Sequence, residues 1–149
     1  MKAAEVTSLV VESAARFGDR NPQQFKHLTS RLQKVPQSEL AHGLLQVFMQ
    51  GSAPPKGSAA QELAGRLLVE LRPKAELDLK AVLSAALPRY ELSVEQFPQY
   101  LGSRFGLDQV LTELEALAGG QLSEQERRSL QTMQFWLGRP NASAAQNGA

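Results

Sequence analysis

The residues of this chain that could do chemistry are few, and their spacing matches no catalytic or metal-binding pattern. Its two histidines, His27 and His42, lie outside the His-Glu-x-x-His pattern that places two zinc ligands on one helix face. A metal site would need acidic ligands from distant parts of the chain, and a histidine general base has no visible partner. We therefore expect two ordinary, partly exposed histidines, with no metal site and no cofactor.

Two pairs of carboxylates are the next candidates for chemistry. Glu113 and Glu115 lie two residues apart, as do Glu124 and Glu126, so on a helix the members of each pair point in different directions. Glycosidase-type catalysis requires two carboxyl groups that face one cleft. The glycine-rich segment 51–57 lacks the Gly-Lys-Ser/Thr ending of a phosphate-binding loop. We therefore expect no catalytic residues and a protein that is not an enzyme.

The composition is that of one soluble globular domain. The chain has 149 residues, of which 42% are hydrophobic and 21% charged. Leucine and alanine supply much of the apolar content, and unbranched side chains favour helix. With 16 basic and 15 acidic side chains, the near-neutral charge argues against generic nucleic-acid binding. No cysteine, no signal-peptide pattern and no apolar run of membrane-spanning length occur, so we expect a soluble, cytoplasmic protein without a membrane segment.

Apolar residues recur at helical spacing in about eight runs, and glycine or proline ends most of them. The expected helices cover about 3–17, 22–35, 39–49, 59–71, 79–90, 94–105, 109–118 and 124–137. Expected single N-caps are Asn21, Ser38, Asp78 and Asp108. Capping boxes are expected where a serine is followed three residues later by Gln or Glu, at Ser58/Gln61, Ser93/Gln96 and Ser123/Glu126.

These helices predict an all-α domain over 1–138, with a possible internal boundary at loop 50–58, and a disordered polar tail over 139–149. Short connections favour antiparallel pairs, stacked either as an α-solenoid, which we prefer, or as a compact irregular bundle. Segment 103–108 echoes segment 15–19, and the interval from Gly18 to Gly51 resembles that from Gly106 to Gly138. The architecture resembles a HEAT-type helical array, without its repeat consensus.

A chain with many fold signals and no catalytic pattern favours a binding protein. We expect a non-enzymatic adaptor that presents a groove of alternate helices to a partner protein. Adjacent Phe135 and Trp136 cannot both face one narrow stripe, so their helix is buried on two sides or offers one ring to a partner. The candidate contact residues are Arg66, Gln99, Arg104, Arg127, Gln131 and Trp136.

Two other functions stay open at this point. The basic first half, with Lys26, Arg31 and Lys34 on one helix, is the candidate for nucleic-acid binding. A pocket between helices near Met49 is the candidate for a small-ligand sensor. Residues 1–56 carry seven basic and four acidic side chains and residues 107–149 carry three and five, a weak dipole that could orient a partner or another copy of the chain.

Overall fold

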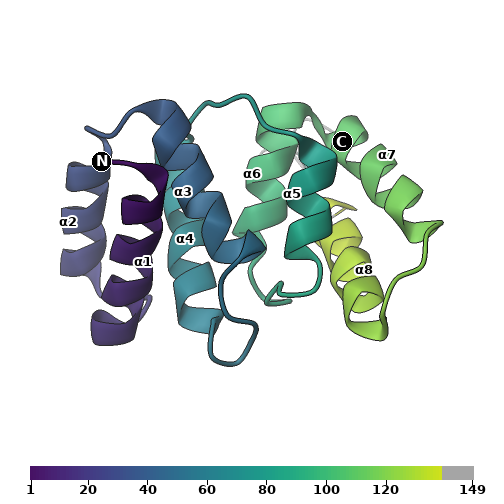
Figure 1. Cartoon of the computed structure of the whole chain (residues 1–149), viewed down its shortest axis with the longest axis horizontal. Helices are drawn as coiled ribbons and strands as arrows, with labels where there is room; N and C mark the ends of the chain where they lie inside the picture. Colours follow the sequence, from purple (N-terminus) through teal and green to yellow (C-terminus); the bar gives the residue numbers. More distant parts are fainter. Residues whose placement is uncertain (139–149) are drawn as a thin grey trace, which may run out of the picture.

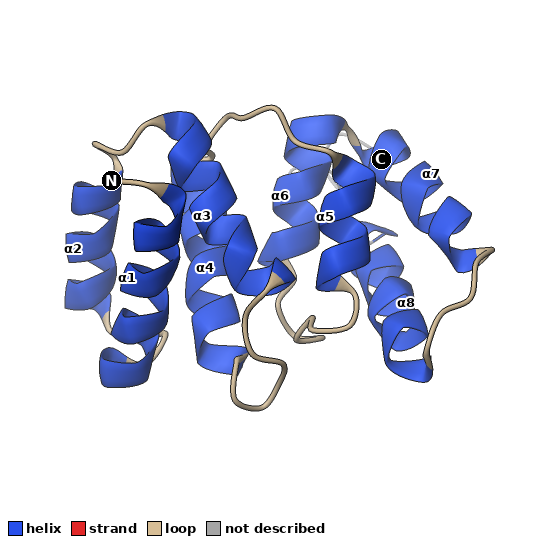
Figure 2. Ribbon diagram, viewed as in Figure 1, coloured by secondary structure: helices blue, strands red, loops and turns tan. Residues whose placement is uncertain are grey.

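The computed structural model describes residues 1–138, which form eight α-helices and no strand (Figures 1 and 2). The predicted all-α class is confirmed. The tail predicted over 139–149 lies outside the described residues. No helix in the described part is long and apolar enough to cross a membrane. The helices are α1 (Ala3–Phe17), α2 (Pro22–Leu32), α3 (Gln37–Met49), α4 (Ser58–Leu71), α5 (Leu79–Ala86), α6 (Gln96–Phe105), α7 (Leu107–Ala118) and α8 (Glu124–Gly138).

Several helix boundaries are set by the local signals expected from the sequence. The amide of Gln24 donates to the side chain of Asn21 at 3.0 Å, and the amide of Ala81 donates to that of Asp78 at 3.1 Å. At the start of α8 the capping box is complete, because the amides of residues 123 and 126 each donate to the other's side chain, at 3.0 and 3.1 Å. These three N-terminal predictions are confirmed.

The other predicted caps are wrong, and tertiary contacts explain the clearest case. The hydroxyl of Ser58 donates to a carboxylate oxygen of Glu91 at 2.6 Å instead of capping α4, whose N-cap is Gly57. The side chain of Gln61 is fully buried and binds the backbone of residues 89 and 91. Helix α6 begins only at Gln96, so no capping box forms there.

Other helix ends also differ from the predicted ones. Helices α3 and α7 each begin one residue before the expected cap. Their N-caps are Pro36 and Gly106 in place of Ser38 and Asp108. Helix α5 ends at Ala86, two residues before a proline that cannot continue a helix. Local sequence signals therefore locate these helices well and their ends less well.

The helices lie in two rows. Each odd-numbered helix packs on the next odd-numbered one, from α1 through α3 and α5 to α7, and the even-numbered helices pack in the same order from α2 to α8. The chain passes from the α1/α2 end to the α7/α8 end of this array (Figure 1). Sequential pairs fit the predicted antiparallel packing. The preference for a solenoid over a bundle is not tested, because two rows of four helices satisfy both descriptions.

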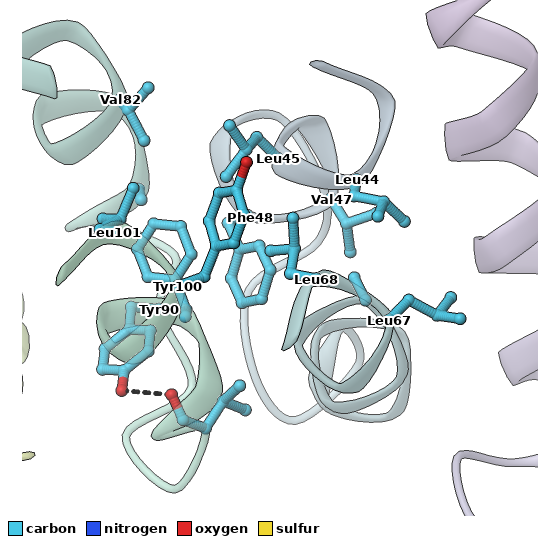
Figure 3. Close-up of a cluster of buried hydrophobic side chains, with 14 of the residues drawn as sticks. Leu44, Leu45, Val47, Phe48, Leu67, Leu68, Val82, Tyr90, Tyr100 and Leu101 are labelled. Atoms are coloured by element: carbon cyan, nitrogen blue, oxygen red, sulfur yellow. Dashed lines mark hydrogen bonds between the residues drawn. The ribbon is translucent and has the colours of Figure 1, made fainter. Parts of the chain in front are cut away.

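One hydrophobic core joins the middle of the array (Figure 3). Its centre is aromatic. The rings of Phe48 and Phe97 stack with their centroids 4.3 Å apart, and the centroid of the Tyr90 ring lies 5.9 Å from that of Phe97. The buried hydroxyl of Tyr90 donates to the carbonyl of Val94 at 2.6 Å, and that of Tyr100 donates to the carbonyl of Pro73. Burial raises the pKa of Tyr100 to about 12. The core therefore fixes α3, α4 and α6 relative to one another.

Candidate interaction surface

All the predicted contact residues lie on the even row of helices. They are Arg66 on α4, Gln99 and Arg104 on α6, and Arg127, Gln131 and Trp136 on α8. Helix α4 packs against α6, and α6 packs against α8. The sequence-based choice of alternate helices therefore corresponds to one row of the structure.

Arg66 differs from the others because its guanidinium already has partners within the chain. Its Nη1 donates to the carbonyl of Asp19, and its Cζ lies 4.3 Å from the centroid of the Phe25 ring. A cation at this distance over an aromatic face is stabilised by the ring's quadrupole. Arg66 thus ties α4 to α2 and to the loop that precedes α2. Because of these contacts, its side chain has little freedom to reach a partner.

Trp136 is also held by the fold. Its indole Nε1 donates to the carbonyl of Leu92 at 2.9 Å, and the side chain is half-buried. The neighbouring ring of Phe135 lies 5.2 Å away, edge to face, and is 60% exposed. The ring that α8 offers to solvent is therefore Phe135, which the list of candidate contacts omitted; the adjacent pair of aromatics was the signal that pointed to it.

Four candidates carry polar groups that form no hydrogen bond or ion pair with the described residues. Gln99, Arg127 and Gln131 are exposed and Arg104 is half-buried. Within residues 1–138 none of these side chains makes a hydrogen bond or an ion pair. The nearest comparable pair is Arg128 with Glu124, at 3.6 Å on exposed side chains, a contact that stabilises little. Helices α6 and α8, which pack against each other, thus each carry polar side chains that have no partner within residues 1–138.

The two rows differ in charge. The even-numbered helices carry six basic and four acidic side chains, whereas the odd-numbered helices carry two basic and six acidic ones. The even-numbered helices are therefore the more basic row of a nearly neutral molecule. Charge separated in this way creates a field that orients a charged partner.

An acidic hollow of about 380 Å³ lies where the loop before α2, the start of α4 and the turn before α6 meet. Burial, reinforced by the charge of Asp19, raises the pKa of Glu62. The hydrogen bond from Ser58 lowers the pKa of Glu91. Both histidines are exposed, and no group of three potential metal ligands occurs in the described residues. Its three acidic side chains, Asp19, Glu62 and Glu91, allow the hollow to attract a cation.

A second hollow, mostly apolar and of about 250 Å³, lies at the end of α3. Val47 and Gly51, which flank Met49 in the sequence, line this hollow. It therefore lies close to the place where the sequence suggested a pocket. Met49 itself is not part of the wall. Lys56 is the one charged side chain among the lining residues.

No protein-family model matches this chain, and no curated protein or solved structure is similar enough to count as a match. The feature of the molecule that bears on function is the set of polar side chains on α6 and α8 without a partner within residues 1–138.

Proposed function

We propose that this protein is a non-enzymatic interaction module that binds an acidic segment of a partner protein along α6 and α8. The observation that supports this proposal is the set of polar side chains on these two adjacent helices that lack a partner in the described part of the chain, on the more basic row. An arginine with no internal partner keeps its five donors available, and its planar guanidinium suits a carboxylate.

The proposal requires a partner segment that lies across both helices. Arg104 comes from α6 and Arg127 from α8, with Gln99 and Gln131 as neutral donors and acceptors on the same two helices. Amide side chains add hydrogen bonds that fix the register of a bound segment, while the arginines supply attraction. The cysteine-free sequence suits a reducing compartment, so the proposal places this activity in the cytoplasm.

Affinity purification of the tagged protein from its own cells, with and without charge reversal, tests the proposal. We expect a stoichiometric partner that is lost from the double variant Arg104→Glu/Arg127→Glu. Lys80→Glu, on α5 of the odd row, reverses one charge away from the surface and should retain the partner. A partner retained by the double variant, or no partner at all, would contradict the proposal.

Nucleic-acid binding is the alternative, and one observation favours it. Helix α2 carries Lys26 and Arg31 and no acidic side chain, with Lys34 just beyond its end; all three are exposed. Neutralisation of three phosphates predicts that log K falls with log salt concentration with a slope of about −3 on duplex DNA. Fluorescence anisotropy with labelled DNA and RNA measures this slope, and affinity independent of salt would exclude the alternative.

A further inference from the structure

The apolar hollow at the end of α3 and the acidic hollow at the start of α4 adjoin each other. Ala59, in the first turn of α4, lines both of them. The chain just before it also contributes to both, because Pro55 lines the acidic hollow and Lys56 lines the apolar one. From α1 and the loop after it, Ala15 lines the apolar hollow and Asp19 lines the acidic one. The two hollows therefore meet at the start of α4.

The apolar hollow has room for a small apolar group. Its walls are formed by small or β-branched aliphatic side chains, which are Val11, Ala14, Ala15, Val47, Ala59 and Ala60. Its volume of about 250 Å³ exceeds the roughly 150 Å³ of a cavity that holds benzene and falls below the roughly 300–1,000 Å³ of sites for drug-sized ligands. Val11 is 41% exposed, so a ligand that covers it removes apolar surface from water. The hollow therefore fits a single ring or a short alkyl chain.

The acidic hollow holds negative charge that the chain neutralises only in part. The carboxylate of Glu62 makes no hydrogen bond or ion pair within residues 1–138, and its burial and the charge of Asp19 both raise its pKa. Asp19 pairs with Arg20 at 3.6 Å, but that arginine side chain is 87% exposed, and a pair of this kind stabilises little. Arg66 already binds the carbonyl of Asp19 and the Phe25 ring. Glu62 and Asp19 are therefore available to a bound cation.

Charge selects the ligand that suits both hollows. Their linings include three acidic side chains, Asp19, Glu62 and Glu91, against one basic side chain, Lys56. A ligand with a carboxylate meets this excess of negative charge, whereas a ligand with an ammonium group is attracted by it. An ammonium group carries three N–H donors and no acceptor, which suits carboxylate oxygens that lack a donor.

We propose that the two hollows together form one binding site for a small apolar amine. The hydrocarbon part of the ligand lies in the apolar hollow, and the ammonium group lies in the acidic hollow, where it pairs with Glu62 and Asp19. The site is independent of the binding proposed for α6 and α8, because its residues come from α1, α3, α4 and the adjoining loops and turns.

Titration of the full chain with phenylbutylamine, followed by two-dimensional NMR spectroscopy of the backbone amides, tests the proposal. We expect saturable shifts of the amides around the two hollows, including those of Ala15, Ala59 and Glu62. Phenylbutanol keeps the hydrocarbon part without the charge and should bind about tenfold more weakly, the size of one charged hydrogen bond. Phenylbutyrate, which carries a carboxylate, should bind more weakly still. Equal affinity for the amine and the alcohol, shifts confined to other parts of the chain, or no binding of the amine would overturn the proposal.

Two variants separate the two halves of the site. Glu62→Gln keeps the shape of the side chain and removes its charge, so it should weaken binding of the amine about tenfold and leave the affinity for phenylbutanol unchanged. Ala15→Trp fills the apolar hollow from an exposed wall position and should abolish binding of both compounds, with unchanged circular dichroism. Glu115→Gln, the control, removes an exposed carboxylate of α7 and should bind both compounds as the wild type does. A Glu62→Gln variant that binds the amine as tightly as the wild type overturns the proposal, and so does an Ala15→Trp variant that still binds it.

Discussion

A close approach between α1 and α3 gives the sharpest test of this fold. Gly43 lies within α3, and a Cβ placed on it would lie 2.6 Å from the Cβ of Val6 and 2.7 Å from the carbonyl oxygen of Ala3, both on α1. The carbonyl of Gly43 also accepts a hydrogen bond from the hydroxyl of Thr7 at 2.7 Å. The substitution Gly43→Ala should therefore force α1 and α3 apart.

Opposing effects determine the size of the change. Alanine is favoured over glycine inside a helix by about 1 kcal/mol. Overpacking at a site formed by backbone and a Cβ, which no rotamer change relieves, costs about 1–3 kcal/mol. Weakening the hydrogen bond from Thr7 removes up to about 1 kcal/mol more. The steric effect prevails, and we expect Gly43→Ala to be less stable by about 1–2 kcal/mol, a fall in Tm of roughly 2–8 °C.

Thermal and urea unfolding followed by circular dichroism measure this difference. Gly102, inside α6, is the matched control. A Cβ placed on it would lie at an ordinary contact distance, 3.4 Å, from its nearest neighbour, a methyl carbon of Leu137. Gly102→Ala should gain the helix-propensity term alone and raise Tm by about 2–4 °C. If Gly43→Ala were as stable as the wild type, α1 and α3 would not approach as described, and the order of the odd row would be wrong.

Three further changes test the core and the buried polar groups. Leu67→Asp puts a charge at a position that is 0% exposed and should abolish cooperative unfolding, as seen in a urea titration. Gln61→Leu removes side-chain hydrogen bonds of 2.7 and 2.8 Å to the backbone of residues 89 and 91 and should lower stability by about 2–4 kcal/mol; unchanged stability would argue against this bridge. Glu62 has a raised pKa, chiefly through burial, so the folded state binds more protons and stability falls as pH rises from 4.5 through that pKa. Glu62→Gln should therefore raise Tm relative to the wild type more at pH 7 than at pH 4, and an equal effect at both would refute this.

The sequence predicted what depends on neighbours along the chain. Apolar spacing located the helices, and caps such as Asn21 worked because their acceptor and donor lie three residues apart. Ser58 and Gln61 failed as a capping box because their partners at residues 89 and 91 are some thirty positions away. A hydrogen-bonding side chain can serve only one geometry, and the sequence does not show the competing long-range partner.

Long-range contacts also separate the candidate residues that suit a binding surface from those that do not. Arg66 and Trp136 were chosen for residue type, yet both are held by groups far away in the sequence, the carbonyls of Asp19 and Leu92. Arginine and tryptophan serve equally well to join helices and to bind partners, so residue type alone cannot distinguish the two uses. What distinguishes them is whether the polar atoms are already satisfied. On that criterion Arg104 and Arg127 are the residues whose substitution should affect binding without loosening the fold.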